Sequence, residues 1–433
     1  MKKIALISHG CAKNLVDSEL MLGVLAQNGY EITLDETESD IVIVNTCAFI
    51  NDAERESIQS ILEMVNEGKK VIVAGCLSQK YKDELKTEIP EISGMLGPTD
   101  IDKLVDIVKN IDTAYVEQIS ISPEYIYPEK IERQQITVGA SSYLKIGDGC
   151  NYRCGYCIIP YLRGNYRSRT IENIEKEAKE LVQKGVTELI LIAQDTTSYG
   201  IDLYGKPMLK EVLERLNQIE NLSWIRIMYA YPTQMSDELL DTIAKLDKVV
   251  KYVDIPLQHS HPDMLKAMKR PSFDYRKLVD NIRKRVPNVG IRTAFIVGYP
   301  GETQEHFEHL YNFVKETKFN KMGVFMYSRE KGTPSYSLKP LVSKKVMKER
   351  YKKLMELQQD ISKEINQQFV GRTLDCIIES YTDDGMVIAR SQYDAPEIDG
   401  VVYIKTDKVV VPGDIEQIKI TDCYEYDLIG EII

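Results

Sequence analysis

The sequence has no apolar run of about 18 residues, the length that a membrane-spanning helix requires. The apolar stretch within MKKIALISHGC ends at Ile7, short of the roughly 7 to 15 apolar residues of an export signal. Low-complexity tracts are also missing, which argues against disorder. These absences predict a folded cytoplasmic protein with no membrane partner.

The length of 433 residues allows roughly two to four domains. The chain has eight cysteines, and disulfides are rare in the reducing cytoplasm. We therefore expect the thiols to be metal ligands, reactive groups or core residues.

Three of the cysteines lie within eight positions, in the run GDGCNYRCGYC, and no fourth cysteine is near them. A disulfide would leave one sulfur over, and a structural zinc site needs four ligands. The spacing of Cys150, Cys154 and Cys157 instead fits three corners of an iron-sulfur cube, with one iron left open. A cluster that only carries electrons or senses is the alternative at this point.

The first part of the chain contains three β-branched runs without polar alternation, KIALIS, DIVIVN and KVIVAG, separated by helical patterns. Such runs are typical of strands buried on both faces of a parallel α/β sheet. Cys11, Cys47 and Cys76 each follow one of these runs closely. Because ligands bind beyond the carboxyl ends of parallel strands, we expect these three thiols to converge on one point.

A structural role is the alternative for these cysteines, since a free cysteine often packs as a small hydrophobic residue. Convergence of all three at one sheet edge is hard to obtain by accident. The two remaining cysteines, Cys376 and Cys423, have no other cysteine at the spacing of a metal-binding motif, and we assign them to the core.

Regular periodicity lapses between residues 110 and 140, which suggests a linker or an extended crossing segment. Beyond it, six strand patterns alternate with helical patterns up to about residue 328. This series predicts a complete or partial βα barrel of the triosephosphate-isomerase type, whose chemistry lies at the carboxyl ends of the strands. The cysteine triplet follows the first of these strands.

The triplet, with the aromatic Tyr156 before its last cysteine, resembles the radical S-adenosylmethionine enzymes. The resemblance implies that the three thiolates hold a 4Fe-4S cluster and that S-adenosylmethionine is the second cofactor. It also implies that the segment GYPGET, with Gly298 and Gly301, lies against that cofactor. A phosphate-loop interpretation of GYPGET is weaker, because the lysine and hydroxyl of a Walker loop are missing.

Four polar residues follow strands of the predicted barrel and are expected to face the same mouth. Gln194 and Asp195 close the second strand, and Gln258 and His259 follow the fourth. Each could equally be a structural polar group. We assign no catalytic residue and no general base, since in the resembled family a radical removes the hydrogen atom.

The order of the predicted domains resembles the methylthiotransferases over essentially the whole chain. We expect an α/β domain at 1–135, the radical barrel at 136–340, a helical linker at 341–369 and a small β barrel at 370–433 that is similar to the TRAM module. The resemblance implies a second 4Fe-4S cluster on Cys11, Cys47 and Cys76, and S-adenosylmethionine as both methyl donor and radical source. An electron donor and a sulfur donor are implied as partners.

The C-terminal segment carries an excess of negative charge, although TRAM modules usually bind RNA. From residue 366 onward the excess is nine charges, in a chain whose formal net charge is −11. The residues are Arg372, Arg390, Lys405, Lys408 and Lys419 against Asp375, Glu379, Asp383, Asp384, Asp394, Glu397, Asp399, Asp407, Asp414, Glu416, Asp422, Glu425, Asp427 and Glu431. Nucleic-acid binding depends on Lys and Arg at the phosphates, so this segment is predicted to repel RNA and attract a basic protein.

The local runs CAKNLVDSELM and APEIDGVVY resemble the methylthiotransferase branch that modifies an aspartate β-carbon in small-subunit ribosomal protein twelve. That basic protein is the expected substrate, free or on the ribosome, and steering by charge is consistent with it. Methylthiolation of a tRNA base by the same chemistry is the alternative.

Overall fold

The N-terminal part of the computed structural model is a six-stranded, all-parallel sheet. The structure describes residues 2–48, 51–120, 132–136 and 139–433. The strands lie in the order β2-β1-β3-β4-β5-β6. Their bounds are β1 Lys3–Ser8, β2 Glu31–Ile32, β3 Ile41–Thr46, β4 Lys70–Gly75, β5 Gly94–Leu96 and β6 Val116–Gln118. From β1 the chain adds β2 on one side and then β3 to β6 on the other, so the strand order switches between β1 and β3. Open α/β sheets bind ligands at such a switch point.

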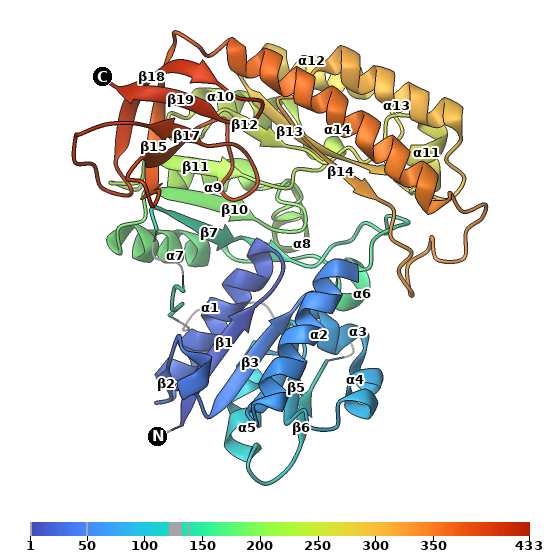
Figure 1. The fold of residues 1–433 in the computed structure, drawn as a ribbon, viewed down its shortest axis with the longest axis vertical. Helices are drawn as coiled ribbons and strands as arrows, with labels where there is room; N and C mark the ends of the chain where they lie inside the picture. Colours follow the sequence, from blue (N-terminus) through green and yellow to red (C-terminus); the bar gives the residue numbers. More distant parts are fainter. Residues whose placement is uncertain (1, 49–50, 121–131, 137–138) are drawn as a thin grey trace.

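Helices cover both faces of this sheet (Figure 1). They are α1 Ala12–Gln27, α2 Asn51–Asn66, α3 Cys76–Lys80, α4 Lys82–Glu88 and α5 Leu104–Asn110. Helix α1 is buried along most of its length, polar residues included. It lies between the sheet and the central domain, so both of its sides are covered (Figure 1).

The central domain is a partial βα barrel made of six parallel strands. β7 Ser141–Lys145, β10 Glu188–Ile192 and β11 Trp224–Ile227 form one half, and β12 Tyr252–Asp254, β13 Gly290–Val297 and β14 Lys321–Met326 form the other. A single bridge between Ile225 and Val249 joins the halves. A short hairpin of β8 Gly147–Asp148 and β9 Arg167–Ser168 follows β7.

Amphipathic helices cover the outside of the barrel and enclose the largest apolar core of the protein. They are α7 Ile171–Gln183, α9 Leu209–Leu216, α10 Asp237–Lys245, α11 Pro262–Ala267, α12 Tyr275–Arg285 and α13 Gln304–Thr317. Two short helices lie apart from this core: α6 Ile159–Leu162 packs through Leu162 against the core of the N-terminal domain, and α8 Ile201–Tyr204 has no buried residue. The cap side chains Thr170, Ser236 and Thr303 accept hydrogen bonds from backbone N–H groups at the starts of α7, α10 and α13.

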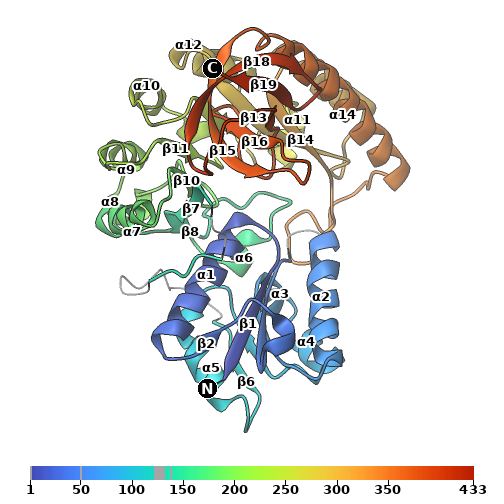
Figure 2. The ribbon, with the colours of Figure 1, turned by 60° about the vertical axis from the view of Figure 1, so that its left-hand side comes forward.

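The long helix α14, Lys344–Gln367, leads to a closed five-stranded barrel of β15 Thr373–Tyr381, β16 Val387–Ser391, β17 Val402–Ile404, β18 Ile415–Cys423 and β19 Leu428–Ile432. The C-terminal barrel packs against both halves of the central domain, since Arg390 pairs with Glu188 of β10 and Asp394 pairs with Lys321 of β14. The N-terminal sheet lies at the other end of the molecule (Figure 2). The predicted fold class, with its three parts, is confirmed. In the part of the chain that the structure describes, no helix is long and apolar enough to cross a membrane.

The structure adds strands that periodicity did not indicate. Val116–Gln118 lies in the segment predicted as a linker, yet it forms the edge strand beside β5. It is too short for a detectable alternation, and so are the two- and three-residue strands β2 and β5. The rest of that predicted linker lies partly outside the described residues.

Candidate functional site

A cavity of about 460 Å³ lies where the N-terminal domain meets the mouth of the central barrel. All six cysteines of the two predicted trios line it. The other two, Cys376 and Cys423, belong to the C-terminal barrel: Cys376 is buried in its core and Cys423 is half-buried against it.

The first trio stands at the carboxyl ends of three adjacent parallel strands. Cys11 is the residue before α1 and follows β1, Cys47 follows β3 directly, and Cys76 begins α3 directly after β4. The close packing requires glycine: a Cβ on Gly10, whose φ is +93°, would lie 2.9 Å from the Sγ of Cys47. Strand order therefore brings together three thiols that are far apart in the sequence, as the sequence predicted.

The second trio lies in the loop between β8 and α6, across the cavity from the first. The N–H of Cys157 donates to the carbonyl of Cys154, at 3.0 Å, so this part of the loop is a tight turn. Burial raises the pKa of Cys150 to about 11 and that of Cys157 to about 12. Burial likewise raises the pKa of Cys76 in the first trio.

Each trio fits an iron-sulfur cluster that takes three ligands from the chain. Cys47, Cys76 and Cys154 are buried, Cys150 and Cys157 are half-buried and Cys11 is exposed. No further cysteine lines the cavity among the described residues. A buried thiol that is protonated when free becomes a thiolate ligand by releasing its proton on metal binding. Three chain ligands would leave one iron of a cube without a ligand from the chain.

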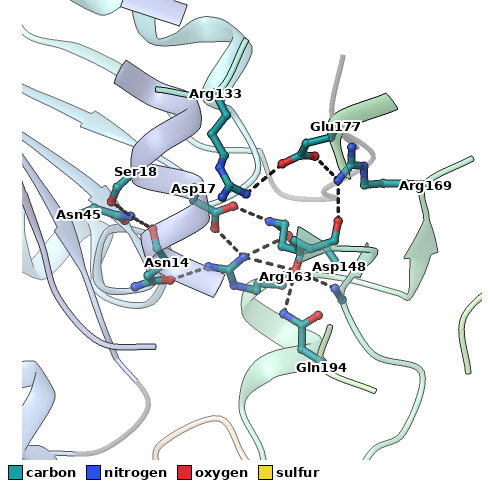
Figure 3. Close-up of polar contacts among 12 residues, drawn as sticks. Asn14, Asp17, Ser18, Asn45, Arg133, Asp148, Arg163, Arg169, Glu177 and Gln194 are labelled. Atoms are coloured by element: carbon teal, nitrogen blue, oxygen red, sulfur yellow. Dashed lines mark hydrogen bonds and ion pairs between the residues drawn. The ribbon is translucent and has the colours of Figure 1, made fainter. Parts of the chain in front are cut away.

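A buried network of ion pairs and hydrogen bonds fixes the N-terminal domain against the central barrel (Figure 3). Arg163, beside α6, contacts Asp17 of α1 at 2.9 Å and Asp148 of β8 at 3.0 Å. Lys145 of β7 pairs with the same two carboxylates. Although burial opposes it, the charges of Arg163 and Lys145 hold the pKa of Asp148 far below its usual value. These ion pairs, in which two cations neutralise two carboxylates, thus fix the position of the N-terminal wall of the cavity relative to its central-domain wall.

Further residues of α1 complete this junction. The side chain of Asn14 donates to the carbonyl oxygens of His9 and Thr46 and accepts from Arg163, at 3.0, 2.9 and 2.7 Å. Ser18 accepts from the side chain of Asn45 at 2.8 Å, and Glu19 pairs with Arg133 at 2.9 Å. Four polar residues of the run CAKNLVDSE are therefore buried because they bond to the central domain, to Arg133 or to the adjacent strand β3: Asn14, Asp17, Ser18 and Glu19.

Of the other predicted site residues, Tyr156, Gln194 and Gln258 line the cavity. Gln194 also donates to Asp148 at 2.8 Å, which connects it to the junction network. Gln258 has φ of +70° where it bridges to Phe295 of β13.

Asp195 and His259 do not line the cavity but have local partners. The carboxylate of Asp195 accepts from the backbone of Thr197 and Ser198, at 2.9 and 3.2 Å, and burial raises its pKa. The Nδ1 of His259 accepts two backbone N–H groups, and its Nε2 lies 3.6 Å from Glu302. These contacts are those of structural polar groups, and a role in cofactor binding stays a prediction.

Gly298 and Gly301 also lie outside the lining, in the loop after β13. Both have positive φ, +78° and +86°. The N–H of Gly298 donates to the carboxylate of Glu302, which in turn pairs with Arg350 of α14 at 2.9 Å. The contact of this loop with S-adenosylmethionine stays a prediction.

Sequence reasoning missed the cations of the cavity and three of its aromatic rings, those of Tyr152, Tyr229 and Tyr231. Lys13 lies with its ammonium 3.3 Å from the centroid of the Tyr229 ring, and the guanidinium of Arg270 lies 4.5 Å from that of Tyr231. Tyr152 stacks on Tyr231 with the ring centroids 3.6 Å apart. Burial lowers the pKa of Lys13 to about 8. Only its position two residues after Cys11 could have pointed to Lys13.

Three family profiles match the chain. They are the radical SAM superfamily over residues 144–314, the uncharacterized protein family UPF0004 over residues 3–97 and the TRAM domain over residues 370–433.

Curated relatives match over their full length. The ribosomal protein uS12 methylthiotransferases RimO of Thermoanaerobacter sp. (strain X514) and of Caldanaerobacter subterraneus subsp. tengcongensis are each 48% identical, over 100% of this chain and 100% of the relative. Among solved structures, the radical S-adenosylmethionine methyltransferase TsrM from Kitasatospora setae, with cobalamin and a [4Fe-4S] cluster bound, aligns with a TM-score of 0.58. That alignment covers 86% of this chain and 80% of TsrM at 15% identity, so the likeness is one of fold.

Proposed function

The chain belongs to the RimO family of ribosomal protein uS12 methylthiotransferases, and we propose that its cavity is where an S–CH3 group is inserted at the β-carbon of an aspartate in uS12. The single observation that carries this assignment is that two trios of cysteines line one cavity. Methylthiolation of a tRNA base is not favoured, because the relatives that match the whole chain are named for uS12.

Cys150, Cys154 and Cys157 would hold the 4Fe-4S cluster of the radical SAM domain. Cys11, Cys47 and Cys76 would hold a second one, whose open position is suited to the sulfur that is transferred. The chemistry that the bound groups supply is hydrogen abstraction from an unactivated carbon, with S-adenosylmethionine as the source of both radical and methyl group.

The chain itself positions the two cysteine trios relative to each other and excludes water from the cavity. The Arg163 network fixes the distance between the trios, since α1 carries Asp17 and begins immediately after Cys11. Tyr152, Tyr156 and Tyr231 line the cavity with rings, which keep solvent from a reactive radical. An external electron donor and a sulfur donor complete the reaction as partners.

The number of clusters is tested by changing the first trio. In the variant Cys11→Ala/Cys47→Ala/Cys76→Ala we expect half of the iron and sulfide of the reconstituted wild type, measured anaerobically. Cys150→Ala/Cys154→Ala/Cys157→Ala should lose the other half, and Cys423→Ala is the matched control that keeps both. A first-trio variant that retains all of its iron would show that one cluster, not two, is bound.

The substrate is tested separately by incubating the reduced, cluster-loaded enzyme with uS12 or with tRNA. We expect a mass gain of one S–CH2 unit on uS12 alone. A gain on tRNA alone would contradict the assignment.

A further inference from the structure

Among the described residues, Lys13 differs from the other polar side chains of the run CAKNLVDSE in having neither an ion pair nor a hydrogen bond. Asn14 and Asp17 bond to Arg163 of the central domain, Glu19 pairs with Arg133, and Ser18 bonds to Asn45 of β3. The side chain of Lys13 has neither an ion pair nor a hydrogen bond within the described residues, although the residue is only 8% exposed. Its ammonium lies 3.3 Å from the centroid of the Tyr229 ring.

The two carboxylates whose charges act on Lys13, Asp254 and Asp148, already have other partners. Asp254 accepts from the N–H of Tyr229 at 3.0 Å and from Arg292 at 3.1 Å. Asp148 is shared by Arg163 and Lys145. An ammonium that is enclosed but unpaired costs folding free energy, so its presence at the cavity wall points to an anion that arrives from outside.

Two cations of the cavity lack a carboxylate partner among the described residues, and they lie beside different trios. Lys13 stands two residues after Cys11, in the first trio. Arg270 lies in the surroundings of Cys154 and Tyr156, in the second. Arg163 also lines the cavity, but its charge is neutralised by Asp17 and Asp148.

The proposed reaction brings two carboxylates to this cavity: that of the methionine part of S-adenosylmethionine and that of the substrate aspartate. The first must lie near the second trio, where Arg270 is in place. The carbon to be modified is adjacent to the second carboxylate and must lie near the sulfur, on the side of the first trio.

On the strength of the proposed function, we propose that Lys13 is the residue that binds the side-chain carboxylate of the target aspartate and so selects an acidic side chain over an amide or a base. The aromatic face of Tyr229 holds the ammonium in position and supplies a partial counter-charge before the substrate enters. The bound carboxylate then holds its own β-carbon at the side of the cavity where the first trio lies.

The test measures binding rather than turnover, with a synthetic peptide that carries the target aspartate of uS12 and the same peptide with asparagine. For the cluster-loaded wild type we expect the aspartate peptide to bind at least about tenfold more tightly, as a charge-assisted pair predicts. In Lys13→Met this preference should disappear through loss of affinity for the aspartate peptide. Lys13→Arg should retain part of the preference.

Three further measurements separate this role from others. Lys13→Met should keep the iron content of the wild type and its affinity for S-adenosylmethionine. Lys352→Met, which removes an exposed lysine of α14, should change none of these values.

A preference for aspartate that persists in Lys13→Met would overturn the proposal, and so would loss of iron or of S-adenosylmethionine binding without loss of the preference. If Lys13→Met does not fold, equal affinity of the wild type for the two peptides overturns it instead. Failure of the wild type to modify uS12 would contradict the proposed function itself.

Discussion

Glu188 is a fully buried carboxylate at the junction of β10 and the C-terminal barrel. It pairs with Arg226 of β11 at 2.8 Å and with Arg390 of β16. Burial alone would raise its pKa, but the charges of Arg390 and Arg226 outweigh burial and hold the pKa at about 2. A carboxyl whose pKa is lower in the folded than in the unfolded chain stabilises the fold above its unfolded pKa.

We therefore expect the stabilisation from Glu188 to be complete above about pH 4.5 and to be lost as the pH falls toward 2, for a total of about 3 kcal/mol. Glu188→Gln should lose a similar amount at neutral pH, because it removes the counter-ion of the buried Arg226 and one of the two carboxylates that pair with the buried Arg390. Trp224, the only tryptophan and the neighbour of Glu188 across β10 and β11, reports unfolding by fluorescence in urea.

The control for this prediction is Glu175→Gln, which removes a carboxylate from the exposed surface of α7. Its pairs with Lys179 and Arg215 are at the surface and are worth less than about 1 kcal/mol. An unfolding free energy of Glu188→Gln equal to that of the control would contradict the role of the buried pair.

At the scale of elements, α14 packs against the loop that follows β13 and holds it in place. Arg350 of α14 pairs with Glu302 of that loop and also donates to its carbonyl oxygen, at 2.9 and 3.2 Å. Gly298, the first residue of the loop, lies under Met347, and a Cβ at Gly298 would come within 2.3 Å of the Cγ of Met347. The position of the loop is therefore set by a helix that is distant from it in sequence.

Gly298→Ala should lower the stability of the protein by on the order of 2 kcal/mol, because it adds both a clash with α14 and a left-handed backbone strain. Adding Met347→Ala should restore the part due to the clash but not the strain, of about 1 kcal/mol. The double-mutant cycle, measured by urea unfolding with Met347→Ala alone as the control, should give a favourable coupling. Strictly additive effects would mean that helix and loop are not in contact.

At the scale of the whole molecule, some of the acidic residues of the C-terminal segment form ion pairs with cations of the central domain. Asp394 pairs with Lys321 at 2.5 Å, and Asp399, with a side chain 3% exposed, lies 3.5 Å from Arg292 and accepts from Tyr252. These carboxylates attach the C-terminal barrel to the central domain. The field that a substrate meets arises from the exposed residues, eight acidic and four basic, and is still negative.

We expect this field to speed the association of uS12 through long-range attraction. Neutralising four exposed carboxylates that have no ion pair within the described residues should lower the association rate at low salt several-fold and flatten its dependence on ionic strength. The four changes are Asp375→Asn, Asp383→Asn, Asp407→Asn and Glu431→Gln. Stopped-flow binding of labelled uS12 measures the rate.

The matched control makes the same change of net charge on the N-terminal domain. It combines Glu67→Gln, Glu88→Gln, Glu91→Gln and Asp106→Asn, all of which are exposed. An equal effect of both sets would assign the attraction to net charge rather than to the C-terminal barrel.

The sequence by itself determined the fold class and the gathering of the thiols. Each apolar β-branched run can only be a buried parallel strand here, and the carboxyl ends of such strands meet at one edge, so cysteines placed directly after them must converge. Short strands such as Val116–Gln118 left no periodic signal, because three residues cannot show one.

Only the tertiary structure decided which charges pair and which remain unpaired. Arg163 binds Asn14, 149 positions away, and Asp394 and Asp399 bind central-domain cations instead of solvent. No local pattern encodes such partners, because the pairing depends on how domains pack. For the same reason the sequence alone does not distinguish Lys13 from a lysine at the surface. Its position in the wall of the cavity, which makes it a candidate anion site, is visible only in the tertiary structure.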